Sequence, residues 1–229
     1  ADSGWAVGCR DSYLEGIGHD EIWAAADAIG VKQIEVQVDK RLNTKSVFDL
    51  SFERYGIANP AKRKKLKAAF DQHGLTICAF CAGHNFDAGR SDEEALEWLG
   101  QVAEAAQEMG VPVIMVPVSG GNELTDEEFI KRGKEFLGAL VPISKKTGVV
   151  FALENLQMFW NRAEVLKPVM EALPTENVAL AHDVTNMYWF GHPIDKIYPL
   201  AETCAPYVAY VHAKNVDYPD DKQNVQREP

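Results

Sequence analysis

Residues 149–155 have the sequence Val-Val-Phe-Ala-Leu-Glu-Asn. The first five residues form an apolar run that begins with two β-branched side chains, and a short run of this kind is typical of a strand buried on both faces. The two polar residues that follow, Glu154 and Asn155, stand where that strand would end. If this strand belongs to a parallel sheet, both residues stand at its carboxyl end, where such sheets carry functional groups.

The same arrangement repeats along the chain. Short apolar runs alternate with polar loops and amphipathic helical stretches, and the starts of successive runs lie between 28 and 43 residues apart. Strands that alternate with helices at this spacing predict βα units and a parallel sheet. The expected strands are residues 5–8, 33–38, 76–82, 113–118, 149–153, 178–181 and 207–211.

Helix start and stop signals lie between these runs. A helix is expected from Asp92 to Met109, with acidic residues in its first turn and a glycine just beyond its end. Residues 125–128, Thr-Asp-Glu-Glu, predict a second helix that opens with a capping box.

Two architectures hold strands and helices in this order. A doubly wound open sheet usually carries a GxGxxG turn after a strand, whereas residues 119–121, Ser-Gly-Gly, form a weaker glycine turn here. We therefore expect an α/β fold of the (β/α)₈ TIM barrel type, as a single domain over residues 1–229. Residues 217–229 are polar and typical of a loop, so we expect the eighth βα unit to be missing and the domain to be truncated at its C-terminal end.

Charge and hydropathy exclude two classes of partner. The formal net charge is −11, and an acidic surface repels a phosphate backbone, so no nucleic acid partner is expected. The basic run at residues 62–67 falls in a helical stretch and is interpreted as a solvated face. No apolar run approaches the roughly 20 residues that a membrane helix needs, so no membrane contact is expected.

The four cysteines indicate a reducing environment. Cys9, Cys78, Cys81 and Cys204 are too few and too scattered for a disulfide framework. Cys78 and Cys81 form a CxxC pair inside a predicted strand, where residues three apart point to opposite faces. We therefore interpret them as structural thiols, and reduced thiols predict a cytoplasmic protein.

Three predicted strands end in residues of the types that bind metal ions. The same number of residues separates Glu154 from Asp183 as separates Asp183 from His212. Alternation along a strand places both carboxylates on the face with the smaller neighbours and turns His182 to the other face, where a structural role is expected. Two carboxylates and an imidazole suit Mn²⁺, Mg²⁺ or Co²⁺, and Zn²⁺ is also compatible. The alternative is a hydrogen-bonded polar cluster that closes the barrel.

Five short motifs stand at or near the expected strand ends: Ala-Leu-Glu154-Asn, His-Asp183-Val-Thr-Asn186, Val-His212-Ala-Lys214-Asn, His84-Asn-Phe86 and Ile34-Glu-Val36. These motifs resemble those of the xylose isomerase-like barrels, which include tagatose and psicose 3-epimerases, inosose dehydratase, hydroxypyruvate isomerase and AP endonuclease. The resemblance covers essentially the whole chain and implies a divalent metal ion bound by Glu154, Asp183 and His212.

The sequence departs from the family pattern at several points. The family's fourth ligand, a glutamate on the eighth strand that also serves the epimerases as an acid/base group, is not in this sequence. Asn186 stands where the epimerases usually have a histidine, and residues 157–160 lack their second glutamate. The extra histidines of the AP endonucleases are also missing, which argues against DNA repair.

Together these observations lead to the hypothesis of a metal-dependent isomerase or epimerase that acts on a ketose or a related keto-polyol through a metal-bound enediolate. Glu154 is the candidate catalytic base. The candidate substrate contacts are His84, Trp160, Asn186 and Lys214. Trp160 would equally serve loop packing, and Lys214 would equally pair with Glu35.

Three points stay open at this stage. One alternative function is a lyase or dehydratase that acts on a keto-sugar or keto-inositol with the same metal site. Another is a non-catalytic sugar-binding barrel, which the missing fourth ligand favours. Assembly into a homo-oligomer is compatible with either.

Overall fold

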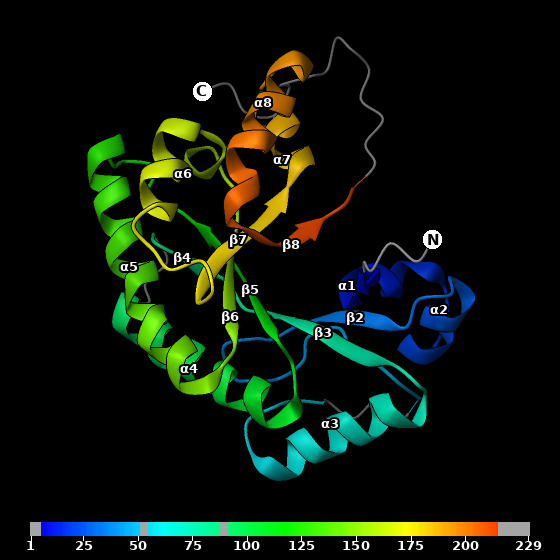
Figure 1. Ribbon diagram of the computed structural model, residues 1–229. Helices are drawn as coiled ribbons and strands as arrows, with labels where there is room; N and C mark the ends of the chain where they lie inside the picture. The colour runs from blue at the N-terminus through cyan, green and yellow to red at the C-terminus, as the bar shows by residue number, and fades with distance from the viewer. Residues whose placement is uncertain (1–5, 51–54, 88–90, 215–229) are drawn as a thin grey trace. The chain divides into compact units, whose positions relative to one another are not determined.

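The computed structural model describes residues 6–50, 55–87 and 91–214. Parallel strands alternate with helices along these residues, as the sequence predicts for an α/β protein (Figure 1). The chain divides into two compact units: residues 1–82 with 98–114, and residues 83–97 with 115–229. The predicted loop at residues 217–229 lies outside the described residues.

The first unit contains three parallel strands, β1 (Gly8–Arg10), β2 (Gln33–Gln37) and β3 (Thr76–Cys81). Arg10 lies opposite Glu35 across β1 and β2. Between β2 and β3 the register shifts, so that Ile34 faces Ile77 but Glu35 faces Ala79. Cys78 is therefore the extra residue of a β-bulge, and plain alternation does not decide which face it occupies.

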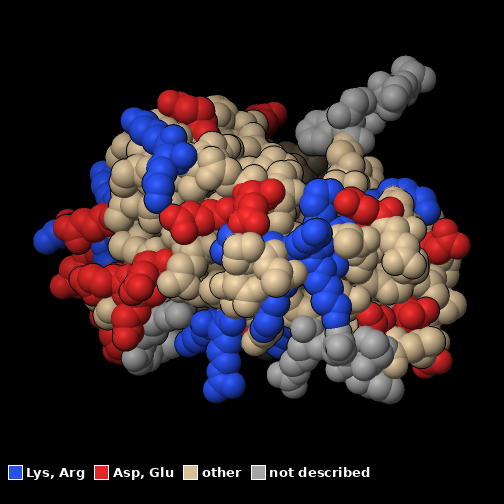
Figure 2. Space-filling view, turned by 90° about the horizontal axis from the view of Figure 1, so that it is seen from below, with Lys and Arg blue, Asp and Glu red and all other residues tan. Residues whose placement is uncertain are grey.

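Short helices accompany these strands: α1 (Asp11–Leu14), η1 (Glu15–Ile17), α2 (Ile22–Ala28) and α3 (Pro60–Gln72). The Asn59 side chain caps α3 by accepting from the Lys62 main-chain nitrogen, and proline takes the first helical position. The lysines of the basic run on α3 are exposed while Leu66 is buried, as expected of a solvated face. Figure 2 shows one face of the molecule, where basic and acidic side chains occur together.

The second unit contains β4 (His84–Asn85), β6 (Val150–Glu154), β7 (Val178–Asp183), β8 (Val208–His212) and all but the first two residues of β5 (Val113–Ser119). Strands β5 to β8 are neighbours in sequence order, and β4 pairs with β5. All six residues of β7 are buried. Glu154 lies opposite Ala181, and Asp183 lies opposite His212, so that the carboxyl ends of β6, β7 and β8 lie side by side.

The remaining helices are α4 (Asp92–Met109), α5 (Asp126–Thr147), η2 (Phe159–Asn161), α6 (Ala163–Met170), α7 (Val184–Trp189), α8 (Ile194–Cys204) and η3 (Ala205–Tyr207). The bounds of α4 are those the sequence predicts. The predicted capping box is present between Thr125 and Glu128, and α5 ends at Gly148, whose φ is 74°.

One predicted strand was misplaced. Residues 5–8 were expected to form the first strand, but β1 is Gly8–Arg10 and Val7 is 75% exposed, while Trp5 lies outside the described residues. The reason is an ion pair between strands, in which Arg10 Nε lies 3.4 Å from Glu35 Oε1. This ion pair allows Arg10 to lie within the strand, whereas the apolar pattern alone predicts that the strand ends before it.

Two other sequence expectations can be placed on the structure. All four cysteines lie in the described residues and none forms a disulfide, with Cys81 and Cys204 buried. Burial raises the pKa of the Cys204 thiol to about 11. Across the described ranges, no helix combines the length and the apolarity needed to cross a membrane.

Candidate metal centre

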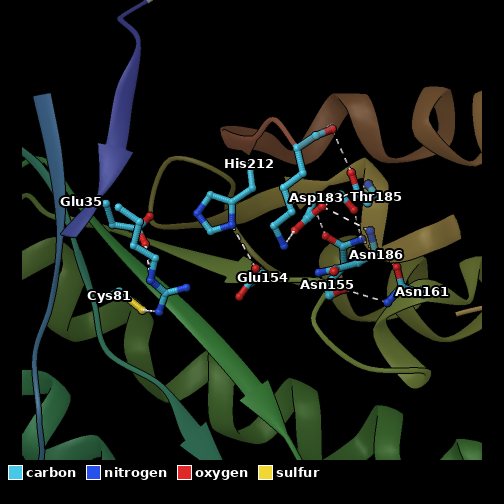
Figure 3. Close-up of polar contacts among 11 residues, drawn as sticks. Glu35, Cys81, Glu154, Asn155, Asn161, Asp183, Thr185, Asn186 and His212 are labelled. Carbon is cyan, nitrogen blue, oxygen red and sulfur yellow. Dashed lines mark hydrogen bonds and ion pairs between the residues drawn. The ribbon is translucent and has the colours of Figure 1, made fainter. Parts of the chain in front are cut away.

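The structure brings together the three strand-end residues that the sequence singles out. One ligand atom from each of Glu154, Asp183 and His212 lies within 4.8 Å of the others. They come from the ends of β6, β7 and β8, and their side chains point toward one another (Figure 3). Each is the last residue of its strand, with Asp183 opposite His212 and Glu154 opposite Ala181, two residues before Asp183.

Hydrogen bonds hold these side chains in place. His212 Nδ1 lies 3.0 Å from Glu154 Oε1. Asp183 Oδ1 accepts from the main-chain nitrogens of Thr185, at 3.1 Å, and Asn186, at 3.2 Å, so that Asp183 caps α7. Glu154 and Asp183 are 2% and 0% exposed, so both carboxylates lie away from bulk water.

The charge of the cluster fits a cation. Asp183 Oδ2 forms an ion pair with Lys214 Nζ, yet it accepts no hydrogen bond from the described residues. Buried carboxylates are costly unless paired or bound to a metal ion. The negative charge of the two carboxylates exceeds the positive charge of one ammonium. With the imidazole, the carboxylates form the oxygen-rich donor set that divalent ions prefer.

A buried amide network lies directly behind the cluster. The Asn155 side chain is fully buried and bonds both main-chain groups of Asp183. Asn161, on η2, bonds the Asn155 side chain in turn. Neither asparagine was among the residues predicted for the site. The only signal in the sequence was the position of Asn155, directly after the strand-end glutamate.

This geometry can be compared with known proteins. Residues 23–229 match the family described as xylose isomerase-like TIM barrel. The chain belongs to this family. The TIM barrel class and the family resemblance predicted from the sequence are thereby confirmed.

Relatives of this xylose isomerase-like barrel are distant. A segment of 102 residues, 44% of this chain, is 28% identical to 2-epi-5-epi-valiolone 7-phosphate 2-epimerase of an Actinoplanes species and spans 38% of that protein. The xylose isomerase domain protein from Planctomyces limnophilus has a TM-score of 0.64 at 14% identity, covering 98% of this chain and 79% of that one. The IOLI protein with a binding zinc atom has a TM-score of 0.59 at 17% identity, covering 82% and 66%. At these identities the two structures show a shared fold.

His84 lies in a different cluster of this barrel. Its Nε2 atom lies 2.8 Å from Asp92 Oδ1, and its ring stacks on Phe136 with centroids 4.9 Å apart. Arg132 bonds both oxygens of the same carboxylate. Burial opposes ionisation of Asp92, but the bonds from Arg132 and His84 outweigh it and lower the pKa. His84 is 5% exposed and ties β4 to α4 and α5.

The structure corrects the prediction that Trp160 contacts the substrate. Its side chain is 0% exposed, and Nε1 donates to the Val118 carbonyl oxygen at 2.9 Å. The ring packs against Phe129 and lies so close to Gly133 that a Cβ there would be 2.9 Å from it. An indole enclosed in this way cannot stack on a sugar, so Trp160 has the packing role considered as its alternative.

Asn186 and Lys214 lie beside the three candidate ligands. Asn186 bonds Asp183 through its main chain, while its buried Nδ2 has no hydrogen-bond partner among the described residues. Lys214 forms an ion pair with Asp183, whereas the alternative role expected from the sequence was an ion pair with Glu35. Both Asn186 and Lys214 therefore stay proposed substrate contacts.

His182 is buried next to Asp183 on β7. Neither of its ring nitrogens has a hydrogen-bond partner in the described part of the chain. Burial lowers its pKa, against the opposing effect of the Asp183 carboxylate. It is not one of the three clustered residues, and its structural role stays a prediction.

The glycine turn at residues 119–121 has a packing function. Gly120 has a φ of 82°, and a Cβ there would lie 2.3 Å from Asn85 Oδ1. The next residue, Gly121, donates its N–H to Asp87 Oδ1 at 2.8 Å. These glycines let the loops after β4 and β5 approach each other closely.

Proposed function

We propose that this xylose isomerase-like barrel is a divalent-metal-dependent isomerase or epimerase of a ketose or a related keto-polyol. The observation that carries the proposal is the convergence of Glu154, Asp183 and His212 at adjacent strand ends. Two relatives support it. One is named as a 2-epimerase, and the other, a neighbour in fold, is described with a zinc atom.

Glu154, Asp183 and His212 would hold the ion, and their donor set suits Mn²⁺, Mg²⁺ or Co²⁺, with Zn²⁺ also compatible. When bound, such an ion acts as a Lewis acid that polarises a carbonyl and makes the neighbouring C–H more acidic. The chain must then supply a base, donors that orient the substrate oxygens, and protection from water.

Glu154 is the proposed base. Its carboxylate would accept the proton from the carbon between the carbonyl and the neighbouring hydroxyl group. His212 Nδ1 holds one carboxylate oxygen at 3.0 Å and so limits the rotation of the side chain. Glu154 is 2% exposed, so its carboxylate lies away from bulk water.

Two further side chains are proposed to orient the substrate. Asn186 Nδ2 is a buried donor with no partner in the described residues, so a substrate oxygen would satisfy it. The Lys214 ammonium has three donors, of which the contact with Asp183 uses one.

Solvent exchange tests the proposal. The full chain, loaded with Mn²⁺ or Co²⁺ and incubated in D₂O with free and phosphorylated ketoses and keto-cyclitols, should incorporate deuterium at carbon next to the carbonyl. Glu154→Gln keeps the side-chain shape but should abolish the signal. Glu171→Gln, which removes an exposed carboxylate on the surface, is the matched control and should retain it. Wild-type exchange by the Glu154 variant would exclude Glu154 as the base.

The same NMR experiment separates the alternatives. A lyase or dehydratase would incorporate deuterium and also lose a β-substituent, which is visible as a new unsaturated product. A sugar-binding barrel would bind a compound from the panel without exchanging any carbon-bound hydrogen.

A further inference from the structure

The Asn155 side chain bonds to the main chain of Asp183 as a peptide group would. Asn155 Oδ1 accepts from the Asp183 nitrogen at 2.7 Å, and Asn155 Nδ2 donates to the Asp183 carbonyl oxygen at 2.9 Å. The regular β6–β7 pairing ends with Glu154 opposite Ala181. The amide therefore extends the attachment of β7 to β6 as far as the residue that carries the carboxylate.

A second amide fixes the orientation of the first. Asn155 Nδ2 also donates to Asn161 Oδ1 at 2.8 Å. Asn161 Nδ2 donates to the carbonyl oxygens of Asn155, at 2.7 Å, and Gln157, at 2.8 Å. Because the Asn161 Nδ2 group is already engaged, Asn161 offers Asn155 only its Oδ1 acceptor. If the Asn155 amide were inverted, its own oxygen would face the oxygens of Asn161 and Asp183 without a hydrogen bond.

We infer that Asn155 is a positioning residue that sets the separation of the Glu154 and Asp183 carboxylates, an inference that rests on the proposed metal-dependent function. The reason is connectivity. Asn155 follows Glu154 directly on the chain, and its side chain holds the main chain of Asp183. One residue thus joins two of the three candidate ligands through a fully buried contact (Figure 3).

A merely structural role would show in stability alone. Removing any buried amide leaves its partners unsatisfied and destabilises the fold. A positioning role predicts in addition that metal affinity and ligand geometry change, since groups that orient metal ligands typically alter affinity by about 10- to 100-fold. The chain offers a matched control, because Asn177 is another buried asparagine, whose Nδ2 bonds Ser144 Oγ at 3.0 Å just before β7 begins.

The test uses Co²⁺ alone as the probe, titrated into the full chain and followed by its visible absorption spectrum, with unfolding measured in parallel. Asn155→Ser should weaken Co²⁺ binding by about 10- to 100-fold and change the spectrum. Asn161→Ser should act in the same direction but more weakly, because Asn155 is retained. Asn177→Ser should lower stability while leaving the affinity and the spectrum as in the wild type.

Four outcomes would overturn the inference, the last of them together with the proposed function. Wild-type Co²⁺ affinity and spectrum in Asn155→Ser would do so, as would an equal loss of affinity in Asn177→Ser. If Asn155→Ser does not fold, unchanged binding by Asn161→Ser decides against the inference. A wild-type protein that binds Co²⁺ no better than His212→Ala would refute the proposed function itself, and the role of Asn155 with it.

Discussion

The buried carboxylate of Asp11 makes the stability of the first unit depend on pH. Asp11 is 0% exposed at the start of α1 and accepts from the main-chain nitrogens of Ser12, at 2.8 Å, and Gln37, at 2.9 Å. Burial raises its pKa to about 6, against the lowering effect of these hydrogen bonds and of Arg10. We predict that Asp11→Asn changes how the free energy of unfolding varies with pH.

The sign follows from proton binding. Between the ordinary pKa of 3.8 and the native value of about 6, the native state holds a proton that the unfolded state has released. The free energy of unfolding therefore falls as pH rises through this window. At about 1.36 kcal/mol per pKa unit, the loss amounts to about 3 kcal/mol. Asp11→Asn does not titrate, but with a single acceptor oxygen it loses one hydrogen bond, worth about 1 kcal/mol.

These two contributions predict a crossover. Asp11→Asn should be less stable than the wild type by about 1 kcal/mol near pH 4 and more stable by about 2 kcal/mol near pH 7. Urea unfolding followed by circular dichroism at a series of pH values measures the difference. Asp27→Asn removes an exposed carboxylate from the same unit, and its profile is subtracted as a control. A difference that is the same at both pH values would refute the assignment to Asp11.

Two further perturbations concern the second unit. The Lys214 ammonium pairs with Asp183 Oδ2 and would repel a cation held by the same carboxylate, so Lys214→Met should tighten Co²⁺ binding by roughly tenfold in a direct titration, and weaker binding would contradict this. Gly133→Ala places a Cβ 2.9 Å from the Trp160 ring and should destabilise the protein by about 1 kcal/mol in thermal unfolding, because overpacking outweighs the gain in helix propensity. Gly138→Ala, on the same helix with its nearest neighbour at 3.9 Å, should instead stabilise it.

The sequence predicts those features that depend on local pattern. Apolar runs and helix signals locate most strands and the bounds of α4, because burial and capping act over a few neighbouring residues. Glu154, Asp183 and His212 could be singled out because parallel strands present their carboxyl ends at one edge, and the chain spaces these residues by one βα unit each.

The features that the sequence does not predict depend on partners distant along the chain. Arg10 extends β1 because Glu35 faces it on the neighbouring strand. The bulge at Cys78 is defined by how β3 pairs with β2, which the sequence of β3 alone does not show. Trp160 lies near a strand end in sequence, but its burial depends on the glycine of another helix. Asn155 looks like an ordinary loop residue until the main chain of β7 is placed beside it.

The metal content of the purified full chain tests the central claim most directly. After chelation, reloading with Mn²⁺ or Zn²⁺ and removal of free metal, elemental analysis should find about one ion per chain in the wild type. His212→Ala should lose most of this metal, while His19→Ala, which removes an exposed imidazole, should retain it. Equal metal content in the wild type and His212→Ala would contradict a metal centre at Glu154, Asp183 and His212.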